Sequence, residues 1–202
     1  LDFYKNAAVA SFAKTLASVK RFARIDARRF VVRDRMRAAA LASIIQRHSD
    51  SYIEAGQIHY ALWRLLHRKI GHTVALRPRF LMDPVVRSLD ISRHLYAPGD
   101  VLTLYCIFHP DRRDPIEDVL AARALIYSKL IRKDEMAPRD GTYPHTRDEL
   151  EVIEIVKKLT LEDCADLFAT IRRLKTDAAR ELVAHHLTAT GRKTFRLQKT
   201  SS

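Results

Sequence analysis

The sequence predicts an all-α protein, and three observations support this fold class. Glycine and proline are scarce, at 5 and 7 of 202 residues, whereas sandwiches and barrels need turn residues at roughly every 8 to 12 positions. Apolar residues recur at three- and four-residue spacing over long stretches, as on one face of a helix. Capping sequences precede several of these stretches. With 47% hydrophobic and 30% charged residues, the chain can bury a core.

The N-terminal third is expected to form three antiparallel helices. The first should cover residues 6–22 and the second should follow Asp26 as its N-cap and end near residue 47. The third should open with the capping box Ser51-Tyr-Ile-Glu54 and end near residue 70. The apolar stripe of the first helix consists of Val9, Phe12, Leu16, Val19 and Ala23.

The periodicity fails after Gly71, where Pro78 and Pro84 indicate an extended linker over residues 73–84. We therefore divide the chain into a three-helix module, residues 1–72, and a mainly helical extension, residues 73–202. The apolar run 101–108 fits either a strand or a helix. Further helices are expected over 84–95 and 114–132, from the capping residues Thr146 and Thr160, and from Thr176 to a stop at Gly191.

Positive charge is concentrated in the first 70 residues. The whole chain carries a net charge of +12, and residues 1–70 hold 14 Lys and Arg against 5 Asp and Glu. Arg29, Arg33 and Arg37 follow one another at four-residue spacing, which aligns them along one ridge of a helix. Such a ridge is often only a solvated face, but its density here favours an acidic partner.

The sequence contains none of the common catalytic or metal-binding motifs. Dinucleotide-binding, Walker A, nucleophile-elbow and zinc-protease signatures are all missing, as is any paired CxxC. Cys106 lies in an apolar run and Cys164 lies beside acidic residues, so neither setting favours a reactive thiolate. We therefore expect no enzyme activity, no catalytic residues, no metal ligands and no transmembrane segment.

Three segments of the N-terminal third resemble one known family. They are residues 10–22 (ASFAKTLASVKRF), residues 27–37 (ARRFVVRDRMR) and residues 51–70 (SYIEAGQIHYALWRLLHRKI). In their order and length they resemble the LYR-motif family of small three-helix mitochondrial proteins. Ser11-Phe12-Ala13 stands where the family has Leu-Tyr-Arg, so the chain resembles a divergent member.

The resemblance implies a non-catalytic adaptor in the mitochondrial matrix that binds acyl carrier protein. The adaptor would have no cofactor of its own, because the partner carries the acylated 4'-phosphopantetheine. Family likeness implies that the carrier contacts Lys14, Arg29, Arg33 and Arg37. It also implies that the acyl chain runs between the helices along Phe12, Leu16, Val19, Leu41, Ile58 and Leu62, which without the resemblance would be ordinary core residues.

The basicity and the family resemblance together allow three roles. High basicity favours the mitochondrial ribosome, with its rRNA, or a ribosome assembly intermediate as the large complex that the adaptor joins. A respiratory complex or ATP synthase is the second possibility, because family members serve there as accessory subunits. A basic ribosome-associated protein that binds RNA without acyl carrier protein is the alternative from a different functional class.

Overall fold

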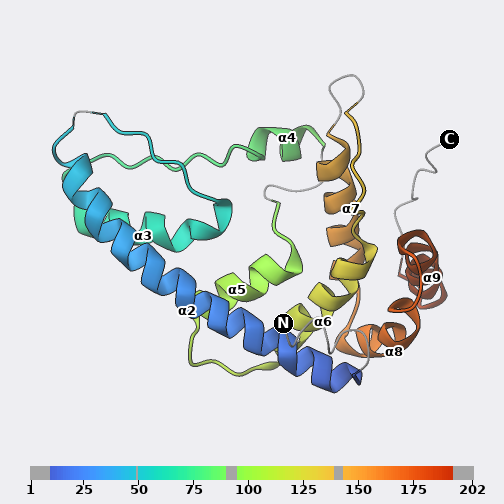
Figure 1. The fold of residues 1–202 in the computed structure, drawn as a ribbon. Coiled ribbons are helices and arrows are strands. Elements are labelled where there is room, and N and C mark those ends of the chain that lie inside the picture. The colour runs from blue at the N-terminus through green and yellow to red at the C-terminus, as the bar shows by residue number, and fades with distance from the viewer. Residues whose placement is uncertain (1–9, 49, 90–94, 139–142, 193–202) are drawn as a thin grey trace.

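The computed structural model describes residues 10–48, 50–89, 95–138 and 143–192, and over these residues it confirms the all-α fold (Figure 1). No strand occurs in the described residues. The helices are α2 (Phe12–Ile45), α3 (Tyr60–Ile70), α4 (Asp83–Ser88), α5 (Pro98–Phe108), α6 (Pro115–Leu130), α7 (Pro144–Lys157), α8 (Leu161–Ile171) and α9 (Thr176–Ala189), and the 3-10 turn η1 (Gln57–His59) precedes α3.

The first two predicted helices are a single helix, so the prediction of a turn at Asp26 is wrong. α2 runs through 34 residues, and Ser11 is its N-cap, accepting a hydrogen bond from the Lys14 backbone. Asp26 instead accepts from the Arg29 guanidinium at 3.0 Å. Residues 12–45 contain no glycine or proline to break the helix. Buried Ala23 and Ala27 continue the inner face straight past Asp26.

The third predicted helix begins eight residues later than expected. Residues 50–56 have no regular structure, and Ser51 therefore caps no helix. Gly56, which is unfavourable inside a helix, precedes η1, and α3 starts at Tyr60. α2 and α3 pack against each other, so the N-terminal third is a helical pair rather than three antiparallel helices (Figure 1).

The remaining helices follow the sequence signals more closely. Run 101–108 lies in α5, which resolves the choice between strand and helix in favour of helix. Asp114 caps α6 and Thr160 forms the predicted capping box of α8. α7 begins at Pro144 rather than at Thr146, because proline suits the first turn. Gly191 has a positive φ of 72° just after α9, as its predicted stop requires.

Some expectations fall outside the described residues. They concern positions 6–9 of the first predicted helix and positions 90–94 of the helix predicted over 84–95. Within the described part, the helix in that second region is α4, which ends at Ser88.

α2 contributes to more than one hydrophobic core. Near its start, Val19, Ala23 and Ala27 pack with Leu102 of α5 and Phe168 of α8. Near its end, Ala38 and Ile45 pack with Leu62, Leu66 and Ile70 of α3. Predicted linker residues Val74 and Leu76 pack onto this second cluster. α2 therefore packs against α3 near its C-terminal end and against the helices that follow α3 near its N-terminal end.

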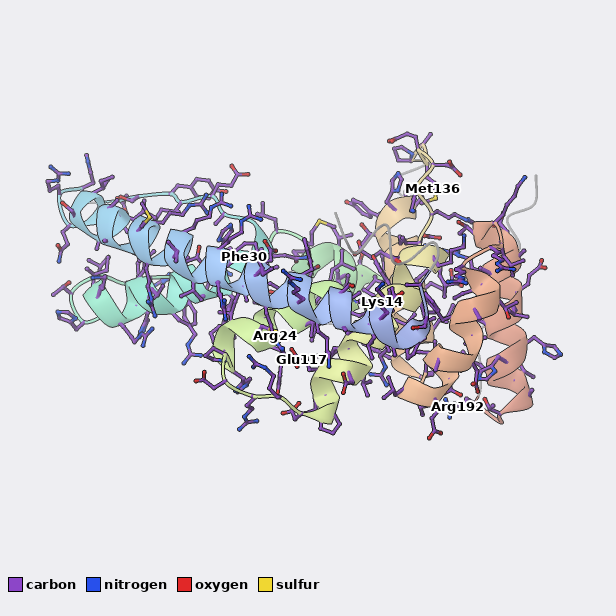
Figure 2. The ribbon with its side chains drawn as sticks, turned by 60° about the horizontal axis from the view of Figure 1, so that its bottom comes forward. Lys14, Arg24, Phe30, Glu117, Met136 and Arg192 are labelled. Carbon is purple, nitrogen blue, oxygen red and sulfur yellow. The ribbon has the colours of Figure 1, made fainter. Side chains whose placement is uncertain are left out.

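Charged groups fix the register between α2 and α6. Arg24 of α2 and Glu117 of α6 point toward each other, with Nε and Oε1 2.6 Å apart (Figure 2). Lys20 pairs with Asp118 at 2.5 Å. Glu117 is buried, so its charge depends on the Arg24 guanidinium for compensation. These two cations of the basic N-terminal third are consequently used inside the fold.

Candidate functional site: the outer face of alpha2 and the cavities beside alpha3

The outer face of α2 exposes an apolar stripe. Phe22, Ile25, Val32 and Met36 are all exposed, Phe22 to 56% and Met36 to 68% of their surface. Their spacing of three, seven and four residues places them on one side of the helix. A row of large exposed apolar side chains is unusual on a surface that contacts only water. We refer to these four residues as the apolar stripe.

Two rows of arginine border the apolar stripe. Helical geometry places Arg29, Arg33 and Arg37 along one edge and Arg21, Arg28 and Arg35 along the other. All six are exposed. The first row is the ridge expected from sequence, and it remains intact because α2 is continuous there. The sequence shows the positive charges of the second row. It does not show that they lie across the stripe from the first row, because that depends on α2 being unbroken.

Most of these arginines have no acidic partner among the described residues. Arg29 pairs with Asp26, and Arg37 contacts His59, whereas no ion pair of the described part involves Arg21, Arg28, Arg33 or Arg35. Lys14 is also exposed, and its helical position places it on the same outer face, nearer the N-terminus. The outer face thus combines uncompensated positive charge with apolar surface.

A buried carboxylate ties this face to the start of α3. Asp34 is fully buried within α2, and its Oδ1 lies 2.6 Å from Nδ1 of His59. Nε2 of His59 lies 3.1 Å from Nη1 of Arg37. Because the same Nη1 also lies 3.5 Å from Nδ1, the guanidinium sits over the face of the imidazole. The resulting chain Asp34, His59, Arg37 holds one arginine of the row in a fixed place.

Two cavities flank the segment that leads into α3. The α2–α3 pocket, of about 570 Å³, is lined by Arg37, Leu41 and Leu62 together with residues 53–56 and His59. The α3 groove, of about 500 Å³, lies between α3 and the segments 51–57 and 75–82, which are mostly without regular structure. Three residues predicted for the acyl-carrier site, namely Arg37, Leu41 and Leu62, therefore meet at one pocket.

The other predicted lining residues lie elsewhere. Phe12 and Leu16 are half-buried against the C-terminal helices, with the Phe12 ring 5.6 Å from that of Phe168. Val19 is buried beside α5 and α6. Ile58 is half-buried in η1 and lines neither cavity. The predicted acyl-chain residues therefore do not form one lining. The reason is that α2 continues straight past Asp26, where the sequence predicts that the chain turns back.

The described residues offer little for nucleophilic or metal chemistry. Burial raises the pKa of Cys106 to about 11, with a further contribution from Glu117, and burial raises that of Cys164 to about 12. Both thiols therefore stay protonated at neutral pH. No group of three or more His, Cys, Asp or Glu within the described residues is arranged to hold a metal ion. No helix among them is long and apolar enough to span a membrane.

Comparison with known proteins gives little indication of function. The chain matches no protein family model and no solved structure. It is similar to a protein of Archaeoglobus fulgidus, which is named only as an uncharacterized protein, with 33% identity over 169 residues. The match covers 83% of this chain but 57% of the relative, so the chain spans little more than half of the relative's length. This similarity provides no support for a mitochondrial, acyl-carrier or ribosomal role.

Proposed function

We propose that the protein is a non-catalytic adaptor that binds an acidic partner protein along the outer face of α2. The observation that supports this most directly is the apolar stripe between two rows of arginine. A surface of this kind fits a partner that presents apolar side chains surrounded by carboxylates. The charges would orient the partner and speed its encounter, while burial of the stripe would supply most of the affinity.

The stripe favours a protein over a nucleic acid as the partner. Phosphate groups would satisfy the arginines, but they would leave Phe22, Ile25, Val32 and Met36 facing water. Acidic residues on a protein can satisfy the same arginines while neighbouring apolar residues cover the stripe. RNA binding is therefore the alternative that the experiment below must separate from protein binding.

Acyl carrier protein is the specific partner that we propose, on the basis of the LYR-like segments. Its acidic surface would contact Lys14, Arg29 and Arg33 on the outer face. The α2–α3 pocket beside Arg37 offers the apolar residues Leu41 and Leu62 to a group carried by the partner. The proposal does not include an acyl chain running along Phe12, Leu16 and Val19, which pack against the C-terminal helices.

Two double variants test this proposal. Arg28→Glu with Arg33→Glu reverses one charge in each row. We expect this double variant to bind acyl carrier protein more weakly by about 2 to 4 kcal/mol. Val32→Ser with Met36→Ser removes half of the stripe and should weaken binding by roughly 1 to 3 kcal/mol. Arg68→Glu with Lys69→Glu makes the same charge change on the exposed surface of α3 and should leave binding unchanged. Calorimetric titration with acylated and unacylated carrier measures all three.

The pattern across variants separates the possible partners. If wild-type protein fails to bind either form of the carrier, acyl carrier protein is the wrong partner. If a ribosomal RNA fragment binds instead, and charge reversal weakens it while loss of the stripe does not, the adaptor proposal is wrong and the face binds nucleic acid. Circular dichroism should show that every variant remains folded, since all the changed residues are exposed.

A further inference from the structure

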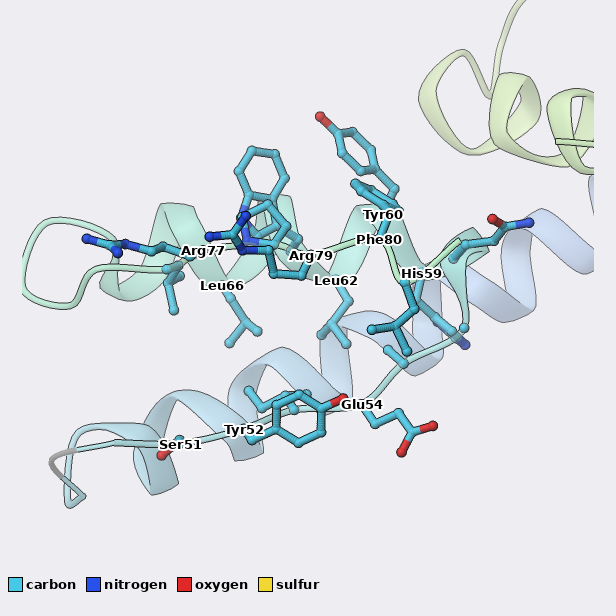
Figure 3. Close-up of a pocket in the computed structure, with 18 of the residues that line it drawn as sticks. Ser51, Tyr52, Glu54, His59, Tyr60, Leu62, Leu66, Arg77, Arg79 and Phe80 are labelled. Atoms are coloured by element: carbon cyan, nitrogen blue, oxygen red, sulfur yellow. The ribbon is translucent and has the colours of Figure 1, made fainter. Parts of the chain in front are cut away.

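The α3 groove has the dimensions of a small-molecule site. Its volume of about 500 Å³ lies within the range that is typical of ligand pockets. Figure 3 shows Leu62 and Leu66 pointing from α3 toward the segment that carries Ser51, Tyr52 and Glu54. These two leucines are buried and give the groove an apolar interior.

Large apolar side chains remain exposed at the rim of the groove. Tyr52 is 80% exposed and Leu81 is 72% exposed, although both line the groove. Tyr60, Trp63 and Phe80 add aromatic rings to the lining, and the rings of Tyr60 and Trp63 lie 5.3 Å apart. An occupant with a flat apolar body would cover this surface and contact ring faces or edges.

Positive charge outweighs negative charge around the groove. Arg77 and Arg79 both come from the segment 75–82 and are exposed (Figure 3). Neither is engaged by a carboxylate of the described residues. Glu54 is the acidic group of the lining, and His59 is already bonded to Asp34 and Arg37. The groove therefore complements a ligand that carries negative charge.

The Trp63 indole adds a second polar requirement. Its Nε1–H is shielded from solvent and has no acceptor among the described residues. A buried donor without a partner costs roughly 1 to 3 kcal/mol. A ligand acceptor would reach this N–H only after the indole turned toward the groove, and the hydrogen bond would then remove the penalty.

We propose that the α3 groove binds a small organic anion with an aromatic body. The body lies against Leu62, Leu66 and the aromatic residues, and the anionic group lies between Arg77 and Arg79. This site is distinct from the apolar stripe of α2, none of whose residues lines the groove. It shares Leu62, His59 and residues 53–56 with the α2–α3 pocket, whereas Arg77 and Arg79 line the groove alone, so the variants that test it are made at these two arginines.

Trp63 provides a direct measurement, because it is the single tryptophan of the chain. Anilinonaphthalene sulfonate serves as the anionic aromatic probe, and uncharged N-phenylnaphthylamine serves as its neutral counterpart. Binding is followed by energy transfer from Trp63 to the dye during titration of the full chain. We expect saturable transfer with one anionic dye per chain and much weaker binding of the neutral dye.

Charge variants locate the bound probe. Arg77→Glu with Arg79→Glu should weaken the sulfonate dye by on the order of tenfold or more, because two attractions become repulsions, while the neutral dye is unaffected. The control Arg68→Glu with Lys69→Glu changes charge by the same amount on α3 but outside the groove lining, and it should bind the dye as wild type does. Equal binding of both dyes, absence of energy transfer, or equal weakening by the control would each overturn the proposal.

Discussion

Single residues in the C-terminal helices carry several structural roles at once, and Asp163 is the clearest case. Its carboxylate accepts from the Thr160 backbone at 2.7 Å and lies 2.8 Å from Nε2 of His186, and it also pairs with Arg192. Burial alone would raise its pKa, but these hydrogen bonds and charges hold the pKa well below its ordinary value. One side chain thus caps α8 and connects it to the end of α9 and to the residue that follows.

The depressed pKa of Asp163 predicts a specific acid sensitivity. A carboxyl group whose pKa is lowered by folding stabilises the protein above its unfolded pKa, near 3.9, and this contribution is lost as pH falls toward the folded pKa. Asp163→Asn should therefore reduce the free energy of unfolding by roughly 1 to 3 kcal/mol at neutral pH and flatten its dependence on pH below about 4. Urea unfolding at several pH values measures both effects. Asp166→Asn, an exposed change in the same helix, should behave as wild type, and an unaltered acid dependence in Asp163→Asn would contradict this account.

At the scale of elements, the sequence predicts helices well where caps and turn residues agree. Thr160, Asp114 and Gly191 each act as their residue types suggest. Asp26 and Ser51 are equally good capping residues by type, but tertiary packing overrides them. The alanines beside Asp26 continue a buried face, and Ile53 packs onto the α2–α3 core from a segment without regular structure. Local sequence carries no signal for these long-range contacts.

For the same reason, the sequence predicts only part of the candidate site. The first arginine row is visible from four-residue spacing alone, and it survives because that stretch is helical under either interpretation. The apolar stripe begins at Phe22, at the end of the first predicted helix, and ends at Met36 in the second. A stripe that crosses a predicted turn cannot be recognised as one surface. The α3 groove depends on two segments folding against α3, which no periodicity in the sequence indicates.

Continuity of α2 can be tested at Asp26. If Asp26 were an N-cap, its replacement by alanine would cost about 0.5 to 2 kcal/mol. In the middle of α2 the same change loses only an exposed ion pair to Arg29 and gains helix propensity, so we expect a change within about 0.5 kcal/mol of zero. Ser11→Ala, at the actual N-cap, should cost about 0.5 to 2 kcal/mol. Chemical denaturation of both variants decides between one helix and two, and a larger loss at Asp26 than at Ser11 would favour two.

At the scale of the whole molecule, α2 connects α3 to the C-terminal helices. Its inner face belongs to both cores, and Arg24 and Lys20 pair with α6. The pair formed by α2 and α3 has one small cluster of buried residues, Ala38, Ile45, Leu62, Leu66 and Ile70. We therefore expect the pair to depend on the rest of the molecule for its stability.

This dependence predicts a single cooperative unfolding transition. Trp63 fluorescence reports on α3, whereas far-ultraviolet circular dichroism reports on all the helices. The two signals should give coincident thermal transitions, as in two-state unfolding. Glu117→Gln, which weakens the buried pair with Arg24, should shift both transitions downward together. A Trp63 transition at lower temperature than the loss of helix would show instead that the pair formed by α2 and α3 unfolds independently.

The length of α2 also constrains which insertions and deletions the protein can accept. One residue added between Ala27 and Ala38, which belong to different cores, would rotate one part of the helix relative to the other by about 100° and shift it by about 1.5 Å. Such a change would turn either Ala38 or Ala23 away from its core and would separate the two ends of the apolar stripe. The connection over residues 50–56 has no regular structure, so an inserted residue there would not rotate one part of a helix relative to another. Relatives of this protein should therefore vary in length within that connection and keep the length of α2 constant.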